Sequence, residues 1–326
     1  MQTKTVYTLI SDSSDYYLEQ ALISVFSLRK HNPQATVELV VDKDTAATLV
    51  EKRSKIKEYV TSIVEIDVPR EYDKKRRSRF LKTNLRQLVK GDYLFIDCDT
   101  VICGKLDEID AFDGDLAAVS DVNGPLPLKD TSVLSRCDKA GFPNLERQPY
   151  FNSGVMLVRD TPLTHQFYER WYANWQLSAS KGVAFDQPAL CQTNVELGKP
   201  MKELPGIWNC QFKYREGYKH LKDALIMHYF NANSKEQWTY PSDMLYQSIK
   251  KKGMIDSTID KLLINPKSLL YTVMTINEES AYRFFNSEMI EIYFNNPTLY
   301  RFVVGVSSLL NKPFKMISKL KSYIIK

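Results

Sequence analysis

The sequence predicts an α/β protein in which helices flank a Rossmann-like, mostly parallel central sheet. The main observation is that strand-like and helix-like stretches alternate through roughly the first hundred residues. A second is the composition, because 326 residues with 44% hydrophobic and 25% charged residues are typical of a globular protein with a sizeable core. From residue 241 onward the strand pattern is lost, which predicts a mainly helical C-terminal extension.

Each predicted element follows from the spacing of its apolar residues. Helical spacing marks residues 18–30, for example, whereas 37–41 is a short β-branched run. We expect strands at 6–11, 37–41, 63–66, 93–96, 154–158 and 225–229, and helices at 18–30, 45–53, 78–89 and 163–177. The expected domains are an α/β domain at 1–240 and a helical extension with a basic amphipathic tail at 241–326.

Residues 121–150 form the least regular part of the predicted α/β domain. They contain the Pro- and Gly-bearing strings NGPLPLKD and GFPNLERQP, together with several charges. This composition predicts a long loop in place of a regular element, and long loops in compact domains often serve as lids.

The net charge of +5 is concentrated at the C-terminus. Residues 292–326 hold six Lys or Arg and no acid, which leaves about −1 for the rest of the chain. A nucleic-acid-binding domain would need basic residues across a folded face, so we expect no nucleic-acid partner.

The cysteines and the N-terminus point to the cytoplasm. The five cysteines form no CxxC pair and suggest no disulfide framework. The N-terminal stretch MQTKTVYTLIS lacks the regions of a signal peptide, and no apolar run approaches the length needed to span a bilayer. We therefore expect a cytoplasmic protein that does not cross the membrane.

The string YLFIDCDTVI carries the clearest chemical signal. It is an apolar strand that ends on two carboxylates, Asp97 and Asp99, and ligands of open parallel sheets bind at the carboxyl ends of strands. Carboxylate oxygens suit Mg²⁺ or Mn²⁺, which would neutralise a departing nucleoside diphosphate. The simpler alternative is that one of the two Asp residues only caps the turn. The absence of GxGxxG and GxxxxGK[ST] disfavours dinucleotide dehydrogenases and P-loop NTPases.

A second enzymatic interpretation fits the same letters. Asp97, Asp99 and Val101 satisfy the DxDx[TV] pattern of haloacid-dehalogenase-type phosphatases, with Asp97 as the nucleophile. In that family the motif normally sits on an early strand and is supported downstream by a catalytic Lys and a paired acidic strand end. Here three strands precede the motif and no DD or GDxxxD element follows it.

Four ordered patches between residue 5 and about residue 238 resemble glycosyltransferase family 8, the group of glycogenin and bacterial lipooligosaccharide galactosyltransferases. They are TLISDSSDYYLEQALISVFSLRKH, then SRFLKTNLRQLVKGDYLFIDCDT, then YFNSGVMLVRD with FDQPAL, and finally HYFNANSK. The resemblance implies a GT-A fold and a retaining hexosyltransferase that uses a UDP-sugar and Mn²⁺ or Mg²⁺. It also implies a glycan or glycolipid acceptor and a role in polysaccharide biosynthesis.

The resemblance also implies a role for each matching residue. The metal ligands would be Asp97, Asp99 and His228. The uridine pocket would use Leu9, Ile10, Ser11 and Tyr17, with the Tyr17 ring stacked on the base. The donor would also contact Arg79, Asp121, Asn152, Ser153 and Lys235, although Asn231 replaces the family's Gly and Lys235 stands one residue late. Asp186 and Gln187 would lie beside the anomeric carbon.

Three of these residues have simpler alternatives. Arg79 ends the basic run KKRRSR and could be a solvated charge, and His228 lies in the apolar run LIMHYF, where a core histidine is common. Asp186 precedes Gln-Pro and could be an ordinary helix N-cap. Retention of configuration could use Asp186 as a nucleophile or proceed by front-face attack, which needs none and which we favour.

The C-terminal tail carries a hypothesis of another class. From residue 314 the apolar residues fall on one helical face and lysines on another. This pattern fits either peripheral binding to an anionic membrane at the inner face of the cell membrane, or packing of the apolar face on the protein's own core. A protein that binds sugar nucleotides without turning them over is the remaining alternative to an enzyme.

Overall fold

The computed structural model describes residues 1–124, 130–212, 214–228 and 242–264, with scattered residues between 296 and 309. The chain divides into two compact units. The first comprises Met1–Lys235 and Ser242–Pro266, and the second comprises Glu236–Pro241 and Lys267–Lys326. Everything described below belongs to the first unit unless stated.

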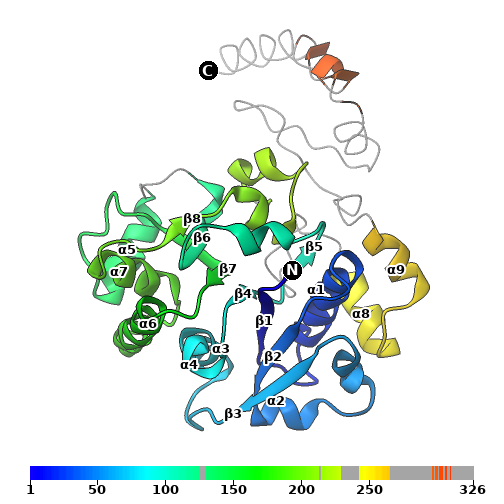
Figure 1. The fold of residues 1–326 in the computed structure, drawn as a ribbon, viewed down its shortest axis with the longest axis horizontal. Coiled ribbons are helices and arrows are strands. Elements are labelled where there is room, and N and C mark those ends of the chain that lie inside the picture. Colours follow the sequence, from blue (N-terminus) through cyan, green and yellow to red (C-terminus); the bar gives the residue numbers. More distant parts are fainter. Residues whose placement is uncertain are drawn as a thin grey trace, which may run out of the picture. The chain divides into compact units, whose positions relative to one another are not determined.

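The predicted parallel sheet is confirmed (Figure 1). Its strand order is β3-β2-β1-β4-β7-β6-β8, and the parallel pairs include β1 with β2, β1 with β4 and β2 with β3. β7 runs antiparallel to both β4 and β6, and a separate two-stranded sheet pairs β5 with β9. The strands are β1 (Lys4–Leu9), β2 (Val37–Asp42), β3 (Ser62–Ile66), β4 (Tyr93–Ile96), β5 (Thr100–Ile102), β6 (Leu116–Ser120), β7 (Phe151–Val158), β8 (Lys202–Glu203) and β9 (Ile226–His228).

Helices cover both faces of the sheet. Successive strand residues point to opposite faces, and in β1 the Tyr7 hydroxyl lies 3.0 Å from Ser24 of α1 while Val6 packs in the cluster that contains Leu81 and Leu85. The α-helices are α1 (Tyr17–His31), α2 (Lys43–Thr48), α3 (Lys74–Thr83), α4 (Leu85–Leu88), α5 (Thr131–Ala140), α6 (Pro162–Ser180), α7 (Gln187–Glu196), α8 (Ser242–Lys252) and α9 (Ser257–Ile264). The 3₁₀ helices are η1 (Glu51–Glu58), η2 (Asp107–Ala111), η3 (Asp121–Asn123), η4 (Gly206–Asn209) and η5 (Arg215–His220).

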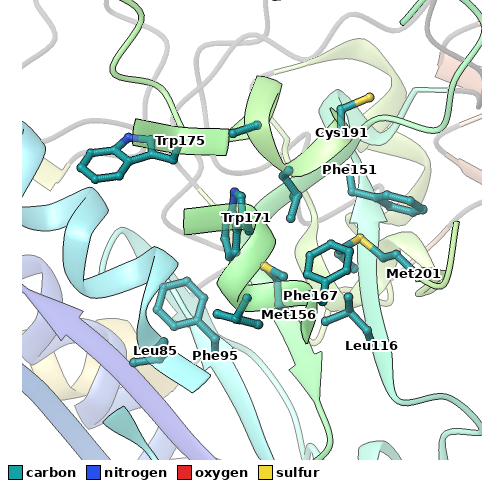
Figure 2. Close-up of a cluster of buried hydrophobic side chains, with 14 of the residues drawn as sticks. Leu85, Phe95, Leu116, Phe151, Met156, Phe167, Trp171, Trp175, Cys191 and Met201 are labelled. Carbon is teal, nitrogen blue, oxygen red and sulfur yellow. The ribbon is translucent and has the colours of Figure 1, made fainter. Parts of the chain in front are cut away.

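A large buried cluster lies between the sheet and helices α3 to α7. Figure 2 shows Phe95 and Met156 of the sheet beside the rings of Phe167 and Trp171 from α6. Each of these side chains is at most 1% exposed. Burial of one such side chain contributes about 1.5–3 kcal/mol, so this cluster fixes the helices against the strands that carry the candidate site.

The structure corrects the prediction of a continuous loop at 121–150. Residues 131–140 form helix α5, because the Asp130 side chain accepts from the backbone N–H groups of Ser132 and Val133 and Gly141 ends the helix with a φ of 91°. Such a left-handed C-cap favours glycine. The Pro- and Gly-rich strings flank this helix, and their composition concealed it.

Two predicted helices are each divided in the structure. The prediction at 45–53 becomes α2 followed by the 3₁₀ helix η1, and the prediction at 78–89 becomes α3 and α4, which meet at Asn84. Helix α3 begins four residues before the predicted start, because the Asp73 side chain accepts from the Arg76 N–H and caps the helix at Lys74.

Helices α8 and α9 confirm the expected helical character after residue 241, for the residues described there. Both contact α1 and belong to the first compact unit, although they lie beyond the predicted boundary at residue 240. The amphipathic tail, 312–326, lies outside the described residues, so its membrane-binding and core-packing interpretations both stay predictions. Among the residues that were described, no helix has the length and apolar character needed to cross a bilayer.

Leu85→Ala tests the main cluster. The side chain is fully buried there, so we expect the substitution to lower the free energy of unfolding by about 2–5 kcal/mol. Leu177→Ala on α6 is the matched control, because Leu177 is 45% exposed and its loss should change stability by less than about 0.5 kcal/mol. Denaturant unfolding followed by circular dichroism measures both, and equal effects would contradict the assignment of the cluster as the core.

Candidate active site

The site lies where β4 ends beside β7. The antiparallel register pairs Ile96 with Val155, and the Asp97 N–H continues the ladder by donating to the Gly154 carbonyl at 2.7 Å. This pairing brings the end of β4, which carries the DxD pair, against the Asn152–Ser153–Gly154 segment of β7. Two patches more than fifty residues apart in the sequence thus form one surface.

The small sheet brings His228 to the same place. Strand β5 follows Asp99 directly, and its antiparallel register with β9 pairs Thr100 with His228. The imidazole Nε2 consequently lies 3.1 Å from Asp99 Oδ1. His228 is 2% exposed, yet it faces the carboxylates at the edge of the core.

Asp97, Asp99 and His228 could hold a metal ion. Each offers one ligand atom, and the three ligand atoms lie within 4.8 Å of one another. Two carboxylates with one imidazole suit Mn²⁺ at least as well as Mg²⁺, and three protein ligands leave positions for diphosphate oxygens. The described residues thus bring together the three predicted ligands.

A chain of side-chain amides fixes the imidazole. His228 Nδ1 lies 2.9 Å from Asn209 Oδ1, Asn209 Nδ2 donates to Asn152 Oδ1 at 2.9 Å, and Asn152 Nδ2 donates to Asp121 Oδ1 at 3.0 Å. The backbone N–H of Gly154 also donates to Asn152 Oδ1. Assigned from this network, the proton of the neutral imidazole sits on Nδ1, which leaves the Nε2 lone pair for a metal.

Gly154 is required by the close approach of His228. A Cβ atom at this position would lie 2.3 Å from His228 Cε1 and 2.9 Å from Asn152 Oδ1. Neither neighbour can give way, because both belong to the amide chain. The Gly in the FNSG segment therefore makes room for the imidazole.

A second set of charged side chains is centred on the carboxylate of Asp186. Its carboxylate accepts from the Ser153 hydroxyl at 2.6 Å, and Arg79 Nε lies 2.8 Å from Oδ1. Lys82 Nζ lies 3.7 Å from Asp186 and donates to both oxygens of Asp97 at 3.0 and 3.1 Å. Asp186 occupies the N-cap position of α7, but its side chain makes no capping hydrogen bond and turns toward these cations.

The pKa values follow from burial and from these partners. Burial raises the pKa of Asp186, but Lys82 and Arg79 outweigh it and hold the pKa at about 2. Burial also raises the pKa of Asp97, which Lys82 offsets only in part. For His228 burial lowers the pKa, whereas Asp99 raises it by more, so the pKa lies above its ordinary value of 6.5. The site in the free protein therefore holds carboxylates balanced by Lys82, Arg79 and the imidazole.

Asp121 and Gln187 form the third part of the site. Gln187 Nε2 donates to Asp121 Oδ1 at 2.9 Å, the same oxygen that accepts from Asn152. Asp121 begins a turn in which Val122 and Asn123 have φ values of 54° and 51°. A β-branched residue rarely adopts this left-handed conformation, and such strain often marks a functional site.

The strained turn is held by Gln211, which the sequence did not single out. Its Oε1 accepts from the Val122 N–H at 2.7 Å, and its own backbone N–H donates to Asn123 Oδ1 at 2.6 Å. The turn therefore keeps its conformation because reciprocal hydrogen bonds with η4 and the residues after it satisfy its polar groups.

The predicted uridine pocket lies at the end of β1. Leu9 and Ile10 are buried in the core, so only their backbone could line a pocket, and the Ser11 hydroxyl donates to Asp15 Oδ1 at 2.7 Å. Tyr17 begins α1 with its side chain 41% exposed, whereas the neighbouring Tyr16 stacks on Tyr246 of α8. Of the two tyrosines, Tyr17 is the one left accessible, and its base-stacking role stays a prediction.

The sequence did not identify Lys82 and Asn209 as site residues. Lys235 was predicted to contact the donor, but it lies outside the described residues. Lys82 is only 3% exposed and contacts both Asp97 and Asp186. Its only signal in the sequence was a lysine three residues after Arg79, directly after the apolar pair Phe80–Leu81. Asn209 had no comparable signal, because it follows Trp208 in a short apolar stretch.

The comparisons with known proteins agree with this geometry. The profile of Glycosyl transferase family 8 matches residues 8–240, well over half of the chain. The chain belongs to glycosyl transferase family 8. It is a glycosyltransferase, the predicted family is confirmed, and the phosphatase interpretation of the DxD motif is wrong.

Solved structures share the fold at low sequence identity. A galactosyltransferase, LgtC, in complex with donor and acceptor sugar analogs is 13% identical, with a TM-score of 0.51 over 79% of this chain and 99% of that chain. The glycosyltransferase GlyE of Streptococcus pneumoniae TIGR4 is 16% identical, with a TM-score of 0.50 over 82% of this chain and 64% of GlyE. The GT-A fold is thereby confirmed. A comparison with curated sequences finds no significant match.

Substitution of Asn209 tests the amide chain through the metal alone. Asn209→Leu removes the partner of His228 Nδ1, and loss of such a partner weakens metal binding by about 10- to 100-fold. Asn209→Asp keeps an acceptor for the Nδ1 proton and should retain most of the affinity. Calorimetric titration with Mn²⁺ measures both variants, and equal losses in the two would contradict orientation of the imidazole by Asn209.

The pKa of His228 sets the pH dependence of metal binding. The metal needs an unprotonated Nε2, and Asp99 keeps the imidazole protonated to a pH above 6.5. Mn²⁺ affinity should therefore fall as the pH is lowered through that raised pKa, by about tenfold for each pH unit below it. Mn²⁺ titrations between pH 8 and 6 test this, with His165→Gln on α6 as a control that should not alter the profile. A flat profile would contradict His228 as a ligand.

Proposed function

We propose that the protein transfers a hexose from a UDP-sugar to a hydroxyl group of a glycan or glycolipid, with retention of configuration, in polysaccharide biosynthesis. The observation that carries this proposal is the convergence of Asp97, Asp99 and His228 beside Asp186 and Gln187. Membership of family 8 supports the same reaction class. We further propose that the protein acts in the cytoplasm.

In this proposal Asp97, Asp99 and His228 hold Mn²⁺ or Mg²⁺. The bound ion would supply Lewis-acid stabilisation of the charge that develops on the departing diphosphate. Arg79 and Lys82 reach the same space, and as fixed cations in a partly buried site they would stabilise that charge without reorganisation. Arg79, which precedes the DxD motif in the sequence, is thus joined by a second cation, Lys82, about one helical turn further along α3.

The residues on the other side of the site would hold the sugar. Asp121, Asn152 and Gln187 already share one hydrogen-bonded oxygen, and their remaining acceptors and donors suit the hydroxyl groups of a hexose. Because this group is tied to His228 through Asn209, the sugar pocket and the metal ligands are held in one rigid framework. Tyr17 would stack on the uracil ring.

Front-face attack fits the environment of Asp186 better than double displacement. Its carboxylate is ionised but is paired with Arg79 and Lys82 and accepts from Ser153, which lowers its nucleophilicity. In the proposed step the acceptor oxygen bonds to the anomeric carbon as the bond to the diphosphate breaks. The acceptor proton passes to the leaving phosphate oxygen, and the products are an α-glycoside and UDP.

Asp97→Asn and Asp99→Asn test the metal proposal. Each removes a charged ligand, so we expect turnover to fall by roughly 10²-fold or more, as for loss of a main charge-stabilising group. The assay is UDP release from a panel of UDP-sugars with Mn²⁺, with Mg²⁺ and with chelator. Asp113→Asn is the control, because Asp113 is fully exposed and, among the described residues, forms its ion pair with Lys202 outside the site.

The outcome separates the alternatives. Metal-dependent release from one UDP-sugar, lost in both site variants and kept in the control, supports the proposal and names the donor. Near-normal turnover of the site variants would contradict the proposal that a metal takes part in the reaction. UDP-sugar binding without release, even with acceptors added, would support a binding protein.

A further inference from the structure

One exposed aromatic ring beside the site is flanked by two cations. Phe185 is 41% exposed and immediately precedes Asp186. Lys75 Nζ lies 3.8 Å from the centroid of its ring, and Arg136 Cζ lies 4.9 Å from it. We call Lys75, Arg136 and Phe185 the basic rim.

The basic rim adjoins the candidate active site through the chain itself. Lys75 stands one helical turn before Arg79 on α3, so the two side chains share a face of that helix. Arg79 contacts Asp186, the neighbour of Phe185. Arg136 comes from α5, the helix that replaces part of the predicted loop. The rim therefore joins two helices at the edge of the reaction centre.

The positive charge of the rim is not neutralised by ion pairs within the described residues. Neither Lys75 nor Arg136 lies within ion-pair distance of a carboxylate there, although Lys74, Arg77 and Arg79 on the same helix all do. The acids Asp73 and Asp130, which precede α3 and α5, are used as N-caps. Burial lowers the pKa of Lys75 and the charges of Arg79 and Arg136 lower it further, while Asp73 and Asp186 oppose this shift only in part.

The geometry also leaves donors free for a ligand. A guanidinium or ammonium that contacts an aromatic ring uses the ring face for attraction. The N–H groups of such a cation that do not point at the ring remain available, and those of Arg match two oxygens of a carboxylate or phosphate. An anion at the rim would also relieve the repulsion between the two cations, which share one ring.

We propose that the basic rim binds a negatively charged group of the acceptor, a phosphate or a carboxylate, so that the protein selects an anionic glycan. This inference rests on the proposed transfer reaction, and it names the class of acceptor for that reaction. The apolar ring of Phe185 would contact the sugar that carries the charge. The rim acts on acceptor binding, and the donor groups of the site are separate from it.

The experiment compares matched acceptors on the full-length protein. The probes are one neutral oligosaccharide, the same oligosaccharide ending in a uronic acid, and the same ending in a hexose 6-phosphate. Binding is measured by calorimetry with UDP and Mn²⁺ present, and transfer is measured with the donor found above. UDP release without any acceptor is recorded separately, because it reports on the donor reaction alone.

We expect a charged probe to bind about tenfold or more tightly than the neutral one. The double variant Lys75→Gln/Arg136→Gln should abolish this preference, whereas the control Lys202→Gln on β8, which pairs with Asp113 outside the site, should keep it. Raised salt should weaken the preference of the unmodified protein, since exposed charges are screened. The uronic acid and phosphate arms tell the two anions apart.

Equal binding of charged and neutral probes would overturn the inference, and so would absence of binding to any probe. If the double variant still prefers the charged probes, other residues cause the preference, and the proposed role of the basic rim is contradicted. Failure of UDP release with a preserved charge preference would instead remove the proposed function and leave the rim as an anion site. Thermal unfolding of the double variant verifies that its fold is intact.

Discussion

Balancing four carboxylates in one partly buried space is the constraint on which the site depends. Asp97 and Asp99 both come from the segment that follows β4, Asp121 and Asp186 come from two other segments of the chain, and all four converge at one end of the sheet. Lys82 and Arg79 balance two of them, His228 a third, and amide groups satisfy the last. Without these partners the charges would repel one another and lose hydration, because burial disfavours each ionised form.

The α/β class could be predicted because it depends on local patterns. The three parallel βα units and strand β4 each carry an apolar run of the right length, and β4 was placed to the residue. Helix α5 was missed because its flanks are rich in Pro and Gly, although Val133 and Cys137 have helical spacing. Strands β5 and β8 are only three and two residues long. Their extended conformation depends on pairing with distant segments more than on local propensity.

The candidate site could be predicted from the sequence only where its residues form a short recognisable motif. The DxD pair and the DQ pair stand out as letters, whereas the nearness of His228 to Asp99 follows from the register of β5 with β9 across more than a hundred residues. Lys82 and Asn209 are ordinary residues in sequence and acquire their roles from what the fold places beside them. The rest of the site therefore required tertiary contacts that no local pattern encodes.

The direction of the amide chain has an origin far from the imidazole. An ionised carboxylate can only accept hydrogen bonds, so Asn152 directs its NH₂ group toward Asp121 and its Oδ1 toward Asn209. Asn209 then donates from its own NH₂ group to Asn152 and directs its Oδ1 toward His228 Nδ1. The Gly154 N–H, which can only donate, imposes the same orientation on Asn152 by donating to its Oδ1. The lone pair on the nitrogen that faces Asp99 is therefore fixed by two groups that do not touch the imidazole nitrogens, the Asp121 carboxylate and the Gly154 backbone.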